Sequence, residues 1–274
     1  MSSAPFVIFL NDEATYQLHV EPTAEALAEL AAKGVVFWGQ KAISRRGVFH
    51  LALSGGSTPR ALYQRLAEAP YAAQLDWPNV HVWWSDERDV PADHPESNYK
   101  LAYETMLSRL PLSPQQIHRV PTELGPSRAA DHYEAEIRAH VGEGRFDLVL
   151  LGLGEDGHTA SLFPGTQALK ATDRLVVANF VPKLDAWRIT FTAPLINAAD
   201  TVFFLVSGAA KATALHSVLL GGYQPEALPA QLIAPVPGKL FWMADADAAA
   251  QAASKPQYPE SDFIYRRIPQ SRTA

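Results

Sequence analysis

The histidine at position 158 follows a glycine-rich turn and is well suited to proton transfer. It stands in the segment GLGEDGHTASLFPG, residues 152–165, directly after Glu155, Asp156 and Gly157. Imidazole exchanges a proton near neutral pH, and we expect a short helix to begin at His158, whose N-terminus disfavours the charged imidazolium. The segment predicts a neutral histidine that acts as a general base, oriented by a carboxylate such as Asp156. The alternative is a helix-capping or buried histidine.

The three glycines of this segment also have the GxGxxG spacing of a dinucleotide-binding loop, at positions 152, 154 and 157. Such a loop needs a strand before it and a long helix after it, whose N-terminus faces the pyrophosphate. FDLVLL, residues 146–151, supplies a strand, but Pro164 limits a helix from His158 to about one to two turns. The sequence favours a turn that presents His158, with the N–H groups of Gly154 and Gly157 as candidate oxyanion donors.

Small and hydroxyl side chains follow a second apolar run. The sequence there is Ser54-Gly55-Gly56-Ser57-Thr58-Pro59. The glycines let the backbone expose its N–H groups, while Thr58 and Pro59 suit the N-cap and the first position of a helix. A helix N-terminus of this kind binds anions, so the segment predicts a phosphate cradle; the alternative is a plain capped turn.

Charged side chains follow two further apolar runs. Ser85-Asp86-Glu87-Arg88 comes after VHVWW, and Ser207-Gly208-Ala209-Ala210-Lys211 comes after TVFFLV. Arg88 can hold a phosphate, while Asp86 or Glu87 can act as a base or position another group. Lys211 at a helix N-terminus opposes the helix dipole unless an anion binds there. A solvated loop and a water-exposed lysine are the alternatives, and Arg188, at a strand start, is a weaker candidate.

Composition argues against several classes of partner. The 274 residues are 47% apolar and carry a net charge of −6, so no basic field attracts nucleic acid or an anionic membrane. The absence of cysteine excludes disulfides and thiolate metal sites, and the other eight histidines show no HExxH-like spacing, so we expect no catalytic metal. No apolar run approaches the length of a membrane helix, and MSSAPFVIFLND lacks the features of a signal peptide. We expect a cytoplasmic protein, monomeric or a small homo-oligomer.

Short apolar runs alternate with helical patterns along the chain. Expected strands cover residues 6–10, 48–53, 80–84, 117–120, 146–151, 174–180, 187–192, 202–206 and 241–245, and expected helices cover 22–43, 59–67, 97–110, 127–141 and 209–220. This alternation predicts an α/β fold with a mostly parallel sheet, covered on both faces, whose ligands bind beyond the carboxyl ends of the strands. We expect one domain over residues 1–274, a surface connection at 225–237 and a loosely held tail from about residue 255.

Five segments, in this order, resemble the 6-phosphogluconolactonase family: LSGGSTPRALY, WWSDERDVPADHPESN, FDLVLLGLGEDGHTASLFPG, RITFTAPLIN and SGAAKA. The resemblance runs from roughly residue 20 to 245. It implies a three-layer α/β/α fold akin to glucosamine-6-phosphate deaminase and ribose-5-phosphate isomerase. It also implies hydrolysis of 6-phospho-D-glucono-1,5-lactone to 6-phosphogluconate, the second step of the oxidative pentose phosphate pathway, without a cofactor. By the same resemblance His158 is the general base, the 54–58 loop, Arg88 and Lys211 bind the phosphate, and Arg188 lines the site.

The sequence is also compatible with two other functions. A hexosamine-phosphate deaminase–isomerase shares this fold, an Asp-Glu pair like Asp86-Glu87 and a Gly-His turn. That family has a glutamate just before the proline and an aromatic residue after the Asp-Glu pair, where this chain has Phe163 and Arg88. The other is a sugar-phosphate binder without catalysis, against which the intact His158 argues. Because no Ser-His-Asp elbow is visible, direct attack by water is expected rather than an acyl-enzyme.

Overall fold

The apolar runs form the strands of two sheets. The structure is a computed structural model that describes residues 16–142 and 144–252. Its strands are β1 (Tyr16–Glu21), β2 (Phe49–Leu53), β3 (Val80–Trp84), β4 (Asp86–Arg88), β5 (Leu148–Gly152), β6 (Val176–Val181), β7 (Ala186–Phe191), β8 (Thr201–Val206) and β9 (Lys239–Asp245). Its α-helices are α1 (Ala24–Arg46), α2 (Ser57–Leu66), α3 (Asn98–Thr105), α4 (Pro126–Val141), α5 (Ala193–Asn197), α6 (Ala212–Leu220) and α7 (Ala246–Ala249).

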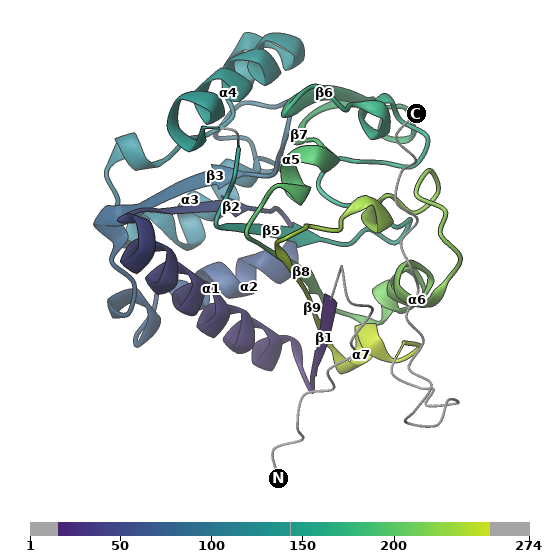
Figure 1. The fold of residues 1–274 in the computed structure, drawn as a ribbon, viewed down its shortest axis with the longest axis horizontal. Coiled ribbons are helices and arrows are strands. Elements are labelled where there is room, and N and C mark those ends of the chain that lie inside the picture. Colours follow the sequence, from purple (N-terminus) through teal and green to yellow (C-terminus); the bar gives the residue numbers. More distant parts are fainter. Residues whose placement is uncertain (1–15, 143, 253–274) are drawn as a thin grey trace.

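The larger sheet is parallel throughout. Its six strands lie in the order β1-β9-β8-β5-β2-β3, so β5 stands between β8 and β2. Every residue of β2 and β8 is buried, which explains why these strands read as unbroken apolar runs. In a parallel sheet all the carboxyl ends lie at one edge, so the loops after β2, β5 and β8 emerge side by side (Figure 1).

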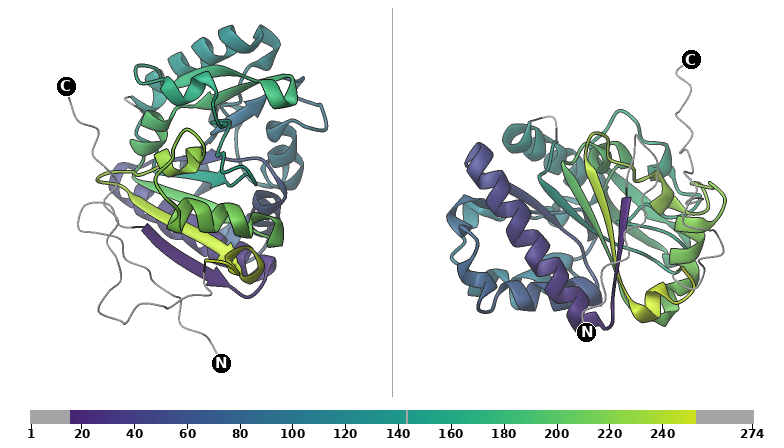
Figure 2. Two further views of the ribbon diagram at one scale, coloured as in Figure 1. Left: turned by 90° about the vertical axis from the view of Figure 1, so that its right-hand side faces the viewer. Right: turned by 60° about the horizontal axis from the view of Figure 1, so that its bottom comes forward.

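Helices cover both faces of this sheet, as the sequence predicts. The helices α1 and α2 lie on one face, and α6 and α7 lie on the other, which gives the three layers visible in Figure 2. The long helix α1 buries small side chains against β9 and β2, and Gly34 is tight enough that an added Cβ would meet the Phe203 ring at 2.7 Å. Close approach of helix to sheet at this point therefore depends on glycine.

A second, antiparallel sheet was not predicted. Its three strands lie in the order β4-β7-β6, and α4 packs against β6 and β7. The chain passes from one sheet to the other at Ser85, whose N–H donates to Leu53 and whose carbonyl accepts from Phe191 N–H. The segment Asp86–Arg88, expected as a loop, is thus an edge strand that continues from β3.

Several element boundaries differ from the predictions. Residues 117–120 form only one bridge, between Val82 and Ile117, instead of a strand. The expected 97–110 helix ends at Thr105 and a 3-10 turn follows at Leu107–Arg109, while β1 was not predicted at all. The strand expected at 6–10 and the tail from 255 lie outside the described residues.

The connection over residues 225–237 is not only a surface loop. Its residues Pro229–Leu232 form a 3-10 turn, and Ala230 N–H donates to the carbonyl of Gly157 at 2.9 Å. Leu228 packs so closely on Gly157 that an added Cβ there would lie 2.7 Å from its side chain. The connection therefore covers the turn that carries His158.

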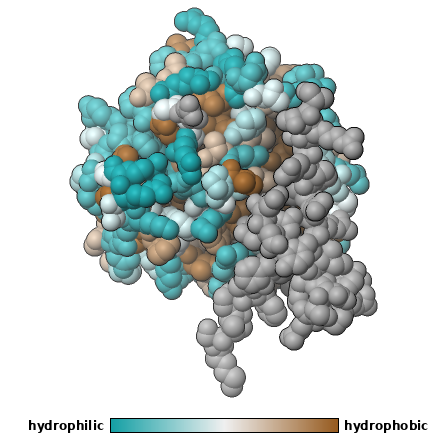
Figure 3. All heavy atoms as spheres, viewed as in Figure 1, coloured by the Kyte–Doolittle hydropathy of each residue, from teal (hydrophilic) through white to brown (hydrophobic). Residues whose placement is uncertain are grey.

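In the view of Figure 3 hydrophilic side chains predominate among the described residues, and hydrophobic side chains show between them near the centre of this face. Among the described residues, no helix combines the length and the apolar character needed to span a membrane.

Candidate active site

Three loops meet at the carboxyl edge of the parallel sheet. They follow β2, β5 and β8, and they contain the segments 54–58, 152–158 and 207–211 that the sequence singled out. Gly152 stands beside Ser54, since an added Cβ would lie 3.9 Å from the Ser54 hydroxyl oxygen. Lys211, in the loop after β8, has its Nζ 3.8 Å from Oε1 of Glu155, in the loop after β5. The structure thus brings together residues that are more than 150 positions apart in the chain.

His158 stands on a tight turn and not at the start of a helix. The Gly154 N–H donates to the His158 carbonyl at 2.8 Å, and Gly157 has a φ of 75°, which favours glycine. Residues Thr159 and Leu162 then form an isolated antiparallel bridge. The predicted short helix is therefore wrong, and a helix dipole cannot be what keeps the imidazole neutral.

Burial keeps His158 neutral instead. Burial lowers the pKa of His158 below its usual value, although the neighbouring Asp156 acts in the opposite direction. The ring stacks on Phe163 with centroids 4.0 Å apart, so one face is shielded from water. An imidazole in this setting is ready to accept a proton at neutral pH.

Asp156 orients the imidazole. Its Oδ1 lies 2.5 Å from His158 Nδ1, and its Oδ2 forms an ion pair with Lys183. Burial disfavours the carboxylate, but the hydrogen bonds from Lys183 and His158 outweigh it and lower the pKa of Asp156 to about 2. Because an ionised carboxylate only accepts, Nδ1 carries the proton and Nε2 is the nitrogen left to act as a base.

Asp86 lies near His158 but does not hydrogen-bond to it. Its Oδ2 accepts from the Ser161 hydroxyl at 2.7 Å, and its negative charge helps to raise the pKa of His158. The neighbouring Glu87 is a structural group, because its buried carboxylate accepts from the N–H groups of Asn98 and Tyr99 at the start of α3. A catalytic role for Asp86 stays a prediction.

The 54–58 loop presents unpaired backbone donors. Helix α2 begins at Ser57 after Gly56, so the prediction of Thr58 as the N-cap is wrong. Among the residues that the structure describes, none accepts a hydrogen bond from the N–H groups of Gly55, Gly56, Ser57 or Thr58. Four consecutive free N–H groups at a helix N-terminus are suited to an anion, so phosphate binding by this loop stays a prediction.

Two arginines face each other across the antiparallel sheet. Arg88 on β4 and Arg188 on β7 are register partners, and neither forms an ion pair with a carboxylate of the described chain. Like charges directly opposite each other destabilise a sheet unless an anion lies between or above them. Burial and the charge of Arg88 lower the pKa of Arg188, which means that an anion bound beside the two guanidinium groups would relieve their repulsion.

The two predicted oxyanion donors are already occupied. Gly154 N–H donates to His158 O at 2.8 Å, and Gly157 N–H donates to Gly154 O at 3.0 Å. Both hydrogen bonds close the turn that presents His158. The glycines therefore shape the turn, and in this conformation they offer no donor to a reacting carbonyl.

Sequence reasoning missed Lys183 and the position of Phe163 against the histidine. Lys183 lies in the turn between β6 and β7, and its ammonium group is 5.2 Å from the centroid of the Phe163 ring. No sequence motif marks an exposed lysine in a hairpin turn as a functional residue. The only available signal was the pairing of the two apolar runs into a hairpin, which would have placed its turn near the site.

A metal-ligand grouping lies elsewhere. Within the described part of the chain, the side chains that could share a metal ion are His118, Glu136 and His140. They neighbour His81, near the amino end of β3, whereas His158 follows the carboxyl end of β5. The candidate active site is thus built from imidazole, carboxylate and cationic groups.

Comparison with known proteins agrees with this geometry. The family model described as glucosamine-6-phosphate isomerases/6-phosphogluconolactonase matches residues 22–242. A 6-phosphogluconolactonase of Nostoc sp. is 44% identical over 216 residues, covering 77% of this chain and 87% of that protein. A 6-phosphogluconolactonase of Synechocystis sp. is 42% identical over 238 residues, covering 85% and 96%. The crystal structure of devB protein superposes with a TM-score of 0.80 at 36% identity, over 87% of this chain and 100% of that one.

The matched region contains each of the three loops and both arginines, and the identity extends over most of the chain and of its relatives. The chain therefore belongs to the glucosamine-6-phosphate isomerase/6-phosphogluconolactonase family.

Proposed function

We propose that this protein hydrolyses 6-phospho-D-glucono-1,5-lactone to 6-phosphogluconate, the second step of the oxidative pentose phosphate pathway. One observation carries the proposal: a histidine oriented by a carboxylate shares one edge of the sheet with an array of unpaired backbone N–H groups. The relatives named 6-phosphogluconolactonase support the same substrate.

The anion donors suit the phosphate of this substrate. The N–H groups of residues 55–58 form one part of the cradle, and Arg88 and Arg188 form another. A phosphate monoester carries about −1.5 to −2 charges at pH 7, so it needs several local donors in a protein with a net charge of −6. Lys211, beside Glu155, adds a further cation at the same edge.

His158 then activates water. Nε2 takes a proton from the water as its oxygen bonds to the lactone C1, while Asp156 stabilises the imidazolium that forms. The tetrahedral intermediate collapses with cleavage of the bond between C1 and the ring oxygen. That oxygen receives the proton from His158, and the products are a carboxylic acid and a hydroxyl group. Nearby Ser161 and Thr159 donate their hydroxyls to Asp86 and to the Gly152 carbonyl, and each is only 1% exposed, so neither hydroxyl is open to attack on a bound lactone.

Phe163 argues against the deaminase alternative. The ring stacks on His158, and it stands where the deaminase sequences carry a glutamate that supports their histidine. With an apolar ring in this place, the chain lacks that carboxylate next to His158. We therefore expect no release of ammonia from glucosamine 6-phosphate.

The test is hydrolysis of freshly generated 6-phosphogluconolactone, corrected for its spontaneous rate. Wild-type protein is compared with His158→Ala and with His132→Ala, an exposed histidine on α4 that serves as a matched control. We expect His158→Ala to lose activity by about 10²-fold or more, while it still binds 6-phosphogluconate, and His132→Ala to stay near wild type. A folded wild type without activity would refute the proposal, and a burst of product before steady state would refute direct attack by water.

A further inference from the structure

Four histidines gather around Trp83, and none of them belongs to the candidate active site. They are His50 on β2, His81 on β3, His140 in the last turn of α4 and His118, which follows the residue that bridges to Val82 of β3. Trp83 stacks on His118 with centroids 3.8 Å apart, and its indole N–H donates to His50. The proposed reaction uses none of these side chains.

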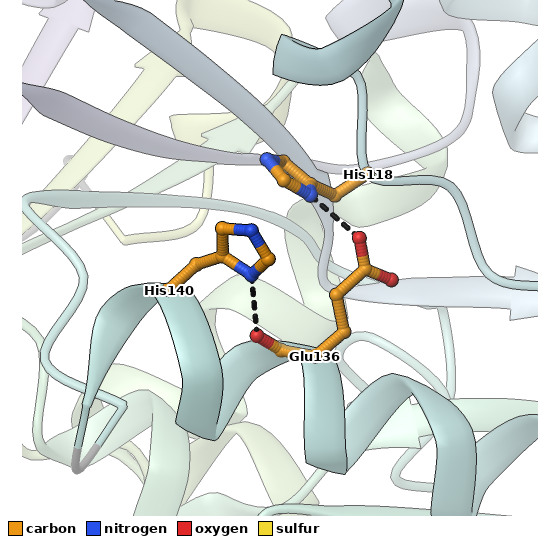
Figure 4. A group of neighbouring side chains, drawn as sticks. All are labelled: His118, Glu136 and His140. Carbon is orange, nitrogen blue, oxygen red and sulfur yellow. Dashed lines mark hydrogen bonds and ion pairs between the residues drawn. The ribbon is translucent and has the colours of Figure 1, made fainter.

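Three groups of this cluster point at one another, as Figure 4 shows. His118 Nδ1 lies 2.6 Å from Glu136 Oε1, and the ligand atoms of His118, Glu136 and His140 all lie within 4.8 Å of one another. Glu136 and His140 are four residues apart on one helix, so they face the same side. The third group comes from a different element, so the grouping ties α4 to the chain beside β3.

Hydrogen bonds prepare the rings for a metal. The Nδ1 of His140 lies 3.0 Å from the Glu136 carbonyl, which only accepts, so Nδ1 carries the proton and Nε2 has a free lone pair. His118 Nε2 lies 2.9 Å from His81 Nδ1. When a metal ion displaces the proton between His118 Nδ1 and Glu136, His118 Nε2 donates to His81, and His81 then fixes the ring orientation as outer-shell partners do in metal sites.

We propose that His118 Nδ1, the Glu136 carboxylate and His140 Nε2 bind a divalent transition metal ion, with zinc as the best-suited ion. Two imidazoles and one carboxylate are a ligand set that zinc uses, and water supplies the fourth position. Ligand atoms around a tetrahedral zinc ion are roughly 3.3 Å apart, which follows from bond lengths near 2.0–2.1 Å. The separations in the metal-free protein, 2.6 Å for one pair and within 4.8 Å for all three, lie on either side of this value, and the ion takes the place of the proton between His118 and Glu136.

This grouping could not be predicted from the sequence, because His118 lies outside the helix that carries Glu136 and His140. Position 118 is 18 residues from Glu136, and neither histidine is part of an HExxH-like motif. The site is independent of the lactonase proposal, because it lies among residues near the amino ends of β2 and β3. Its role would be to hold α4, and with it the antiparallel sheet on which α4 packs.

Isothermal titration of the full-length, metal-free protein with ZnCl₂ tests the proposal. We expect one ion per chain for wild type, and affinity at least about tenfold weaker for His140→Ala and for Glu136→Gln. Both replaced groups are at least partly exposed, so these variants should fold, and circular dichroism checks this. His132→Ala, an exposed histidine on the same helix, is the matched control and should bind as wild type does.

Thermal unfolding and cobalt absorption give two further readouts. Zinc should raise the Tm of wild type and of His132→Ala but not that of His140→Ala. Co²⁺ should give the visible spectrum of a tetrahedral site in wild type and in His132→Ala, but not in His140→Ala. His158→Ala should keep full zinc affinity, which distinguishes this site from Asp156 and His158. No zinc binding by wild type, or unchanged binding by both His140→Ala and Glu136→Gln, would overturn the proposal.

Discussion

Replacing Asp156 with asparagine tests how His158 is made into a base. The carboxylate Oδ1 lies 2.5 Å from His158 Nδ1, and the substitution keeps the shape of the side chain while removing its charge. A hydrogen bond to a charged group contributes about 1.5–3 kcal/mol. If this contribution is lost as the imidazolium forms, kcat/KM for 6-phosphogluconolactone falls by about 10- to 150-fold.

The pH dependence of kcat/KM gives a second prediction for Asp156→Asn, which concerns the direction in which the profile shifts. Burial lowers the pKa of His158, and Asp156 counteracts part of that effect. A general base is active when unprotonated, so the wild-type kcat/KM should fall on the acidic side with an apparent pKa below the usual histidine value. Without the carboxylate the pKa of His158 drops further, and this acidic limb moves to lower pH.

Lys183→Met is the matched comparison, because it should move the limb in the opposite direction. The Lys183 ammonium pairs with Asp156 and lowers the pKa of His158 through its positive charge. Its removal therefore moves the acidic limb to higher pH. The Lys183 side chain is 54% exposed, so the loss of rate should stay below about fivefold. The test is to measure kcat/KM from pH 5 to 8 for wild type and both variants. Limbs that move in the same direction, or an unchanged kcat/KM for Asp156→Asn, would refute this account of the site.

Three further predictions concern the cradle and the frame around it. Arg88→Ala and Arg188→Ala should each raise KM for the phosphorylated lactone by about tenfold or more, with much less effect on unphosphorylated gluconolactone; equal effects on both substrates would contradict phosphate binding. Gly55→Ala should destabilise the fold by about 1–3 kcal/mol in urea unfolding, because the new Cβ would lie 1.9 Å from Asn98 Oδ1. Hydrogen bonds outweigh burial and lower the pKa of Glu134 to about 2, so Glu134→Gln should cost about 1–3 kcal/mol at pH 7. Because that folded-state pKa lies below the unfolded one, the difference should vanish as the pH falls toward 2, and a constant difference would contradict it.

The parallel sheet could be predicted from the sequence because each of its strands is marked by a short stretch of neighbouring residues. Strands such as β2 and β8 are buried on both faces, so each appears as a short, continuous apolar run bounded by small or polar residues. The rule that ligands bind beyond the carboxyl ends of parallel strands then placed three loops together. The structure confirms that placement, with Ser54, Gly152 and Lys211 at the same edge.

The antiparallel sheet could not be predicted in the same way because its pairing is not local. Strand β4 pairs with β7 about 100 residues later, and nothing in SDER indicates that partner. Only this pairing places Arg88 directly opposite Arg188. Each arginine alone is an ordinary charged residue, and only the two side by side indicate a place for an anion.

The turn at His158 shows a different limit of sequence reasoning. Residues 158–163, HTASLF, suit a helix, but Ala160 has a φ of 46° and Thr159 donates its hydroxyl to the Gly152 carbonyl. These contacts, together with Leu228 packed on Gly157, hold the turn in a non-helical form. Tertiary contacts outweighed local propensity here.

Burial of His158 serves one half of the proposed reaction and opposes the other. A buried imidazole stays neutral and ready to accept a proton, yet the reaction must pass through a buried imidazolium. Asp156 resolves this conflict because it is already ionised, with its pKa lowered to about 2, and its charge lies next to the ring that becomes positive. Lys183 in turn keeps Asp156 ionised, although its own charge disfavours the imidazolium. The negative charge is therefore in place before the substrate binds, so forming the imidazolium needs no large rearrangement of the site.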